Sequence, residues 1–112
     1  MKQNDHLNKG KRLEKSQQKL NPTDDWEAIV EIIYNAAIQY IAYYSELSIN
    51  THRDSHKGLP KFLDNNNFAS LAQLFRELDI LRISRWYGGQ SNGNTVRLAR
   101  DKLDQIKQIC GI

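Results

Sequence analysis

The chain has 112 residues, 39% of them hydrophobic and 26% charged, and its formal net charge at pH 7 is +3. These values are typical of one soluble globular domain, and no apolar run is long enough to span a bilayer. The single cysteine, Cys110, excludes an internal disulfide and a cysteine-based zinc cage, and no apolar core follows Met1 as in a secretory signal, so we expect a cytoplasmic protein without a membrane partner.

Residues 1–20 are polar and basic. They hold six lysines and arginines against two acidic residues, so this segment carries +4 and the rest of the chain −1. Leu7, Leu13 and Leu20 form only a thin helical stripe. We predict a basic N-terminal arm, or a frayed helix docked by those leucines, ahead of a bundle domain at residues 21–112. A basic segment can attract nucleic acid or can simply be solvated, and no aromatic residue in it can stack on bases.

Residues 24–47 form the clearest predicted helix. Thr23, Asp24 or Asp25 can be its N-cap, and Asp24 with Glu27 has the spacing of a capping box. Apolar side chains recur at steps of three and four, which keeps them on one helical face. They are Trp26, Ile29, Val30, Ile33, Ala37, Tyr40, Ile41, Tyr44 and Leu47.

Two further helices follow a polar connection. The first is short, can be capped by Ser55 and has Pro60 in its first turn. The second spans residues 68–87 and ends at the glycine pair 88–89. One face of the second helix collects Phe68, Leu71, Leu74, Phe75, Leu78, Leu81 and Arg85.

The last helix can be capped by Asn94 or Thr95. Its apolar seam, which needs a packing partner, consists of Val96, Ala99, Leu103, Ile106 and Cys110. No alternating strand pattern is present. The sequence therefore predicts an all-α antiparallel helical bundle of four to five helices.

The stretch from Leu78 to Gly89 holds the densest set of chemical groups. Arg82 and Arg85 lie three residues apart and share a helical face, which Tyr87 approaches only if the last turn distorts. Two guanidinium groups beside a phenol can hold a phosphate or a carboxylate. The structural alternative is that the arginines complement the helix dipole and Trp86 fills the core.

Buried arginines would instead need acidic partners. Glu31, Glu77 and Asp79 are available for that role.

His52 and His56 are four residues apart and could be metal ligands on one helical face. Asn50, Thr51 and Gly58 favour a loop there, and no third ligand has a suitable neighbourhood. We therefore expect a turn, with no bound metal and no cofactor.

The order of these pieces resembles the HEPN superfamily, the higher eukaryote and prokaryote nucleotide-binding domains. The resemblance covers about residues 24–110 and rests on the early-helix stretch 34–37, the Ser-His-Lys-Gly-Leu turn at 55–59 and the helix end at 81–89. It implies an antiparallel α-bundle that is often dimeric. Active members cleave RNA with an arginine and a histidine separated by a short spacer, frequently as toxins paired with a nucleotidyltransferase antitoxin.

Arg82 matches the arginine of that motif, but Tyr87 stands where the histidine is expected. A histidine exchanges protons near neutral pH, whereas tyrosine has a reference pKa of about 10 and remains a donor. His56 would be a substitute only if the fold brought it near, and Ser84 could orient a phosphate. The resemblance therefore implies impaired catalysis.

Three functions follow. The first is a HEPN-like binding or partner-regulating module whose phosphate or RNA surface consists of Arg82, Ser84, Arg85 and Tyr87. The second is a metal-independent ribonuclease of the toxin type that uses Arg82 and Arg85, with Tyr87 or His56 in acid–base roles. The third is a structural dimerisation adaptor in which the arginines are internal hydrogen-bond donors. The expected partners are RNA, a nucleotidyltransferase-type antitoxin and a second copy of the chain.

Overall fold

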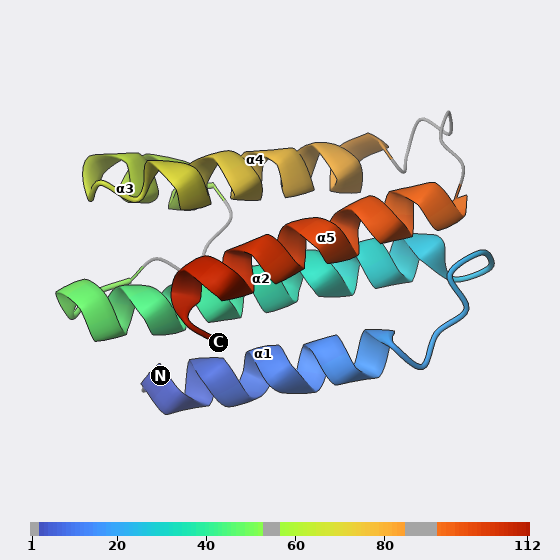
Figure 1. Ribbon diagram of the computed structural model, residues 1–112, viewed down its shortest axis with the longest axis horizontal. Helices are drawn as coiled ribbons and strands as arrows, with labels where there is room; N and C mark the ends of the chain where they lie inside the picture. The colour runs from blue at the N-terminus through green and yellow to red at the C-terminus, as the bar shows by residue number, and fades with distance from the viewer. Residues whose placement is uncertain (1–2, 53–56, 85–91) are drawn as a thin grey trace.

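The described part of the chain is an all-α bundle, which confirms the predicted fold class (Figure 1). The computed structural model describes residues 3–52, 57–84 and 92–112, and only the backbone of Ser84, Asn92 and Gly93. Every element in these ranges is a helix. They are α1 (Gln3–Gln17), α2 (Trp26–Ile49), α3 (Leu59–Asn65), α4 (Ala69–Ser84) and α5 (Asn92–Cys110).

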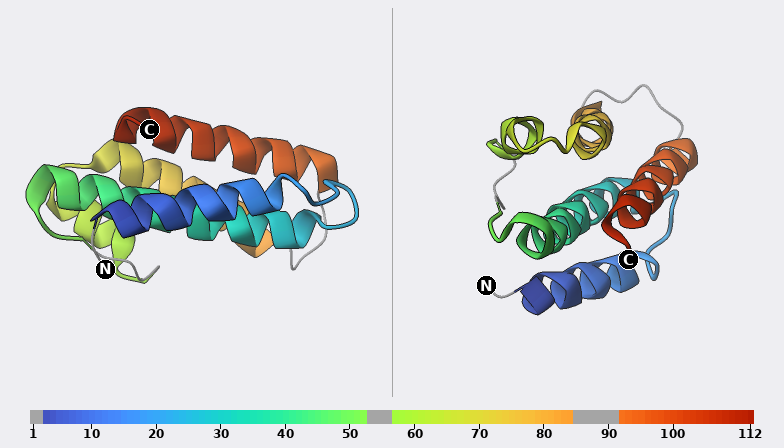
Figure 2. Two further views of the ribbon diagram at one scale, coloured as in Figure 1. Left: turned by 90° about the horizontal axis from the view of Figure 1, so that it is seen from below. Right: turned by 60° about the vertical axis from the view of Figure 1, so that its left-hand side comes forward.

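The helix α2 lies at the centre of the bundle and contacts α1, α4 and α5. α1 covers one side of α2, whereas α4 and the short α3 lie on the opposite side (Figure 2). Successive long helices run in opposite directions, so α2 and α5 run the same way (Figure 1). Among the residues that the structure describes, no helix combines the length and apolar character needed to cross a bilayer.

Because α2 is surrounded, more of its surface is buried than one predicted stripe. Ala36, Ala42 and Ser45 are buried together with most of the predicted face, and the two alanines let neighbouring helices approach closely. Leu47 was predicted to lie on the buried face, but it is 55% exposed in the last turn of α2.

The start of α2 differs from the predicted capping box. The helix begins at Trp26, and its N-cap Asp25 makes no side-chain capping bond. Instead the Asn21 side-chain oxygen accepts from the backbone N–H groups of Thr23 and Asp24, at 2.8 and 3.1 Å. Asp24 therefore belongs to an Asx turn that precedes the helix. It is not the N-cap residue, so it cannot form the predicted capping box with Glu27.

The apolar seam of α5 is buried as predicted, but the helix begins earlier than expected. It starts at Asn92, so Asn94 and Thr95 lie in its first turn and do not cap it. The side-chain oxygen of Asn94 accepts from Arg97. Pro60 lies in the first turn of α3 as predicted, the N-cap is Gly58, and Ser55 lies outside the described residues.

The first segment is a 15-residue helix, and Leu7, Leu13 and Leu20 pack against the core as predicted. His6, Gly10 and Gln17 are its buried residues, whereas the leucines are only partly buried. At Gly10 the helix passes so close to the ring of Tyr40 that an added Cβ would lie 2.7 Å from Cε1 of that ring. Gly10 is therefore required by close packing between α1 and α2.

Candidate functional site

Arg82 joins α4 to α2 from a largely buried position, with its side chain 20% exposed. Its Nε and Nη2 donate to Oδ1 of Asp79 at 2.9 and 2.8 Å. Nη1 lies 3.9 Å from a carboxylate oxygen of Glu31, and the guanidinium carbon lies 4.5 Å from the ring centre of Tyr34. Two of the three acidic partners proposed for a buried arginine are thus present, whereas Glu77 pairs with Lys102.

This environment fixes the charge states of the Arg82 cluster. Burial lowers the pKa of Arg82, but the hydrogen bond and charge of Asp79 outweigh it, so the pKa is raised. Burial, followed by the charge of Asp79, raises the pKa of Tyr34 to about 12. Near neutral pH the cluster consequently holds a charged guanidinium against carboxylates and a neutral phenol.

The positions of the other predicted site residues relative to Arg82 are not described by the structure. Arg85, Tyr87 and His56 lie outside the described residues, and Ser84 is described only as the last residue of α4. Their assignment to phosphate binding or catalysis stays a prediction.

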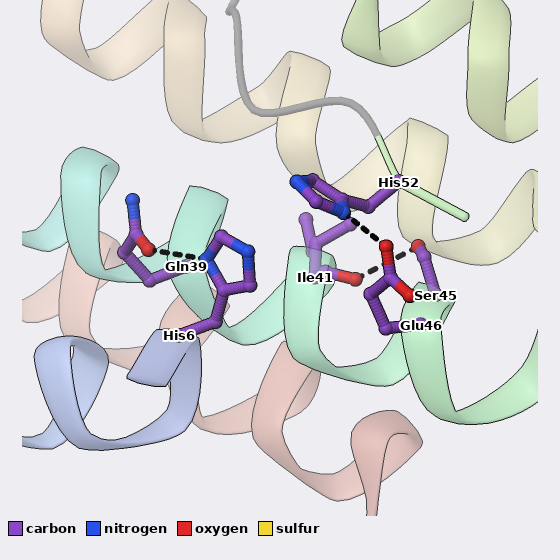
Figure 3. Close-up of polar contacts among 6 residues, drawn as sticks. All are labelled: His6, Gln39, Ile41, Ser45, Glu46 and His52. Carbon is purple, nitrogen blue, oxygen red and sulfur yellow. Dashed lines mark hydrogen bonds and ion pairs between the residues drawn. The ribbon is translucent and has the colours of Figure 1, made fainter. Parts of the chain in front are cut away.

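A pair of histidines, not predicted as a pair, joins His6 of α1 to α2 and to His52 in the segment after α2 (Figure 3). His6 is fully buried, and its Nδ1 lies 2.8 Å from the side-chain oxygen of Gln39. The ring of His52 lies across it, with the ring centres 4.5 Å apart, and Nδ1 of His52 bonds to Glu46. Hydrogen bonds to these oxygens place the Nδ1 proton on each ring.

The Nε2 atom of His6 has no hydrogen-bond partner among the described residues. Because His6 is fully buried, this edge of the ring packs between the helices without a polar contact from the described residues. The described residues bring together no group of three His, Cys, Asp or Glu side chains placed to hold a metal. We therefore assign the histidine pair to the docking of α1.

The second polar link to α1 runs through Glu14. Its Oε1 accepts from the hydroxyl of Tyr40 at 2.6 Å, and its Oε2 lies 3.0 Å from Nζ of Lys107 on α5. Burial and the neighbouring Glu14 carboxylate raise the pKa of Tyr40. Gln17 adds a third link, since its side-chain oxygen accepts from Nε and Nη2 of Arg100.

The outer face of α1 carries cations of a different kind. Lys11, Arg12 and Lys15, which we call the α1 basic stripe, are exposed and have no carboxylate partner among the described residues. The basic side chains of α4 and α5 are engaged. Arg76, Arg82, Arg97, Lys102 and Lys107 have carboxylate partners, and Arg100 bonds to Gln17.

The sequence predicts that residues 1–20 are basic, but it does not single out Lys11, Arg12 and Lys15 within that segment. The spacing of Lys11 and Lys15 indicates a shared helical face once residues 3–17 are known to be one helix. Apolar periodicity gives only a thin signal for the outward face, because Leu7 and Leu13 are partly buried and the centre of the inward face is made of His6, Gly10 and Gln17. A comparison of this chain with protein-family models, curated proteins and solved structures finds no match.

Proposed function

We propose that this chain is a HEPN-like binding module that holds the phosphate backbone of RNA through the α1 basic stripe without cleaving it. The observation that carries the proposal is the presence of unpaired, exposed Lys11, Arg12 and Lys15 on a helix that is itself firmly docked. Cations that are not engaged by carboxylates are available to replace the counterions of a polyanion. The choice of RNA rests on the resemblance to HEPN domains.

The geometry of α1 supports this use. Lys11 and Lys15 are one turn apart, and Arg12 lies beside them on the same outward face. Because His6, Gly10 and Gln17 hold the opposite face against α2, the cations project from a rigid support. A rigid row of charges loses less conformational entropy on binding than a disordered arm does.

The pairing of Arg82 supports the absence of cleavage. A guanidinium that stabilises a reacting phosphate must face that phosphate, whereas Arg82 is directed to Asp79 and to the ring of Tyr34. A ribonuclease would have to exchange the Asp79 contact for its substrate. The described geometry therefore favours a structural role for Arg82, in line with the adaptor hypothesis for this residue.

The proposal is tested by fluorescence anisotropy with a labelled single-stranded RNA at 50–200 mM salt. Neutralising the stripe with Lys11→Gln, Arg12→Gln and Lys15→Gln should weaken binding and lower the salt slope by about 2, since each single-strand phosphate contact contributes about 0.7. The matched control is the combined Lys19→Gln, Lys57→Gln and Lys61→Gln variant, which removes three exposed lysines outside α1.

Equal losses in the stripe variant and in the control would reject the assignment to α1. RNA recovered after incubation should be intact. Cleavage that disappears in Arg82→Ala would instead establish the ribonuclease alternative.

We also propose a homodimer through α4. Ile80 and Ile83 are 65% and 45% exposed and lie three residues apart, so one partner can cover both. Sedimentation should show a dimer that Ile80→Lys converts to a monomer, and a wild-type monomer would contradict this part. The nucleotidyltransferase-type partner stays a prediction that rests on the resemblance alone.

A further inference from the structure

An open surface hollow of about 280 Å³ lies between α1 and α5, beside the α1 basic stripe. Lys11 and Lys15 line it from α1, and Lys107 lines it from α5. Tyr40 of α2 and Glu14 line its inner side, and Gln18 and Ile112 line the rest. Three lysines from two different helices thus line one space.

The inner side of this hollow is held in place by hydrogen bonds. Tyr40 is fully buried and donates to one oxygen of Glu14, and the other oxygen of Glu14 holds Lys107. Glu14 accepts from one of the three N–H groups of the Lys107 ammonium, so this cation is held in place by its carboxylate partner and still has two N–H groups that can donate to a ligand. Lys11 and Lys15 are exposed, so their long side chains can close over a bound group.

The charges of this hollow match one chemical group. Three ammonium groups and one carboxylate leave a side-chain charge of +2. A phosphate monoester carries about −1.5 to −2 at neutral pH and has three terminal oxygens, whereas an internal phosphodiester carries a single charge and has two free oxygens. Each of the three lysines can accordingly donate to one oxygen of a monoester.

We propose that this hollow binds the terminal phosphate monoester of an RNA chain. The inference rests on the proposed RNA binding and specifies which part of the RNA is recognised.

The test compares three RNAs of one sequence that carry a 5′-phosphate, a 3′-phosphate or hydroxyls at both ends. At least one phosphorylated RNA should bind about tenfold more tightly than the hydroxyl form, the gain expected from charge-assisted hydrogen bonds. Lys15→Gln should reduce this ratio to near one. The matched control, Arg12→Gln, changes a cation that does not line the hollow and should weaken all three RNAs equally.

The outcomes separate this inference from the proposal on which it rests. Equal affinity for all three RNAs overturns the terminal-phosphate site and leaves the proposed RNA binding intact, whereas no RNA binding overturns both. A nucleoside monophosphate should displace the phosphorylated RNA better than inorganic phosphate does. Equal displacement would assign the hollow to a free ion and would overturn the inference. Because Lys15 is exposed, the thermal melt of Lys15→Gln should match the wild type.

Discussion

Replacing Gly10 with alanine tests whether α1 is seated against α2 as described. In an exposed helix this change stabilises by about 1 kcal/mol, because alanine has the higher helix propensity. Here the new Cβ would lie 2.7 and 2.8 Å from Cε1 and Cδ1 of Tyr40. These atoms belong to a fully buried ring whose hydroxyl is held by Glu14, so the ring has little room to move.

Overpacking of this kind typically costs about 1–3 kcal/mol, which cancels or exceeds the propensity gain. We expect Gly10→Ala to lower the free energy of unfolding by up to about 2 kcal/mol, and in no case to stabilise the protein as alanine does in an exposed helix. Urea unfolding followed by circular dichroism measures this change. The control is Asn8→Ala on the exposed face of the same helix, which should be neutral or slightly stabilising.

A double-mutant cycle assigns the cost to the ring. In a Tyr40→Leu background the penalty of Gly10→Ala should largely disappear. If Gly10→Ala stabilises the protein as much as Asn8→Ala does, α1 is not packed on Tyr40 and the docking described above is wrong.

Three further predictions concern buried groups. The raised pKa of Tyr34 means that the folded state holds the phenol proton more tightly than the unfolded state does. The difference contributes about 2–3 kcal/mol to the free energy of unfolding. This contribution is fully present below pH 10 and is lost as the pH rises from 10 to 12. Unfolding measured across this range should show a smaller loss for Tyr34→Phe, and identical curves would refute the assignment. Burial raises the pKa of Cys110 to about 12, so iodoacetamide at pH 8 should alkylate it only after unfolding in urea, and rapid reaction of the native protein would contradict its burial. His6→Ala should cost about 2–4 kcal/mol in thermal unfolding by opening a cavity and leaving Gln39 unpaired, whereas Asn4→Ala, an exposed neighbour, should cost nothing measurable.

The sequence was most informative where one apolar face decides the packing. The seam of α5 from Val96 to Cys110 is buried because its side chains recur at the helical period and face α2 and α4 from one side of the helix. The same argument fixed the inward positions of α2 from Ile29 to Ile41. The ends of the helices were less predictable, because turns such as the one built by Asn21 compete with the cap positions of Asp24 and Asp25.

The docking of α1 could not be read from periodicity. Leu7 and Leu13 pack against the core, but the centre of the inward face consists of His6, Gly10 and Gln17, none of which counts as apolar, and the partners of these residues lie far away in the chain. Glu14, for example, joins Tyr40 and Lys107, and such long-range polar pairs have no local signal. Glu31, Glu77 and Asp79 could be identified from the sequence as possible partners of Arg82. Whether Arg82 contacts Glu31 depends on how closely α2 packs against α4, which has no local sequence signal.

The central claim is that Arg82 stabilises the bundle while the α1 basic stripe binds the ligand. The most direct measurement determines the melting temperature and the RNA dissociation constant together for Arg82→Gln and for the combined Lys11→Gln, Arg12→Gln and Lys15→Gln variant. We predict that Arg82→Gln loses about 1–3 kcal/mol of stability but, when folded, binds RNA as the wild type does. We predict that the stripe variant keeps the melting temperature of the wild type and binds RNA more weakly. An Arg82→Gln protein with unchanged stability and abolished RNA binding would contradict the account.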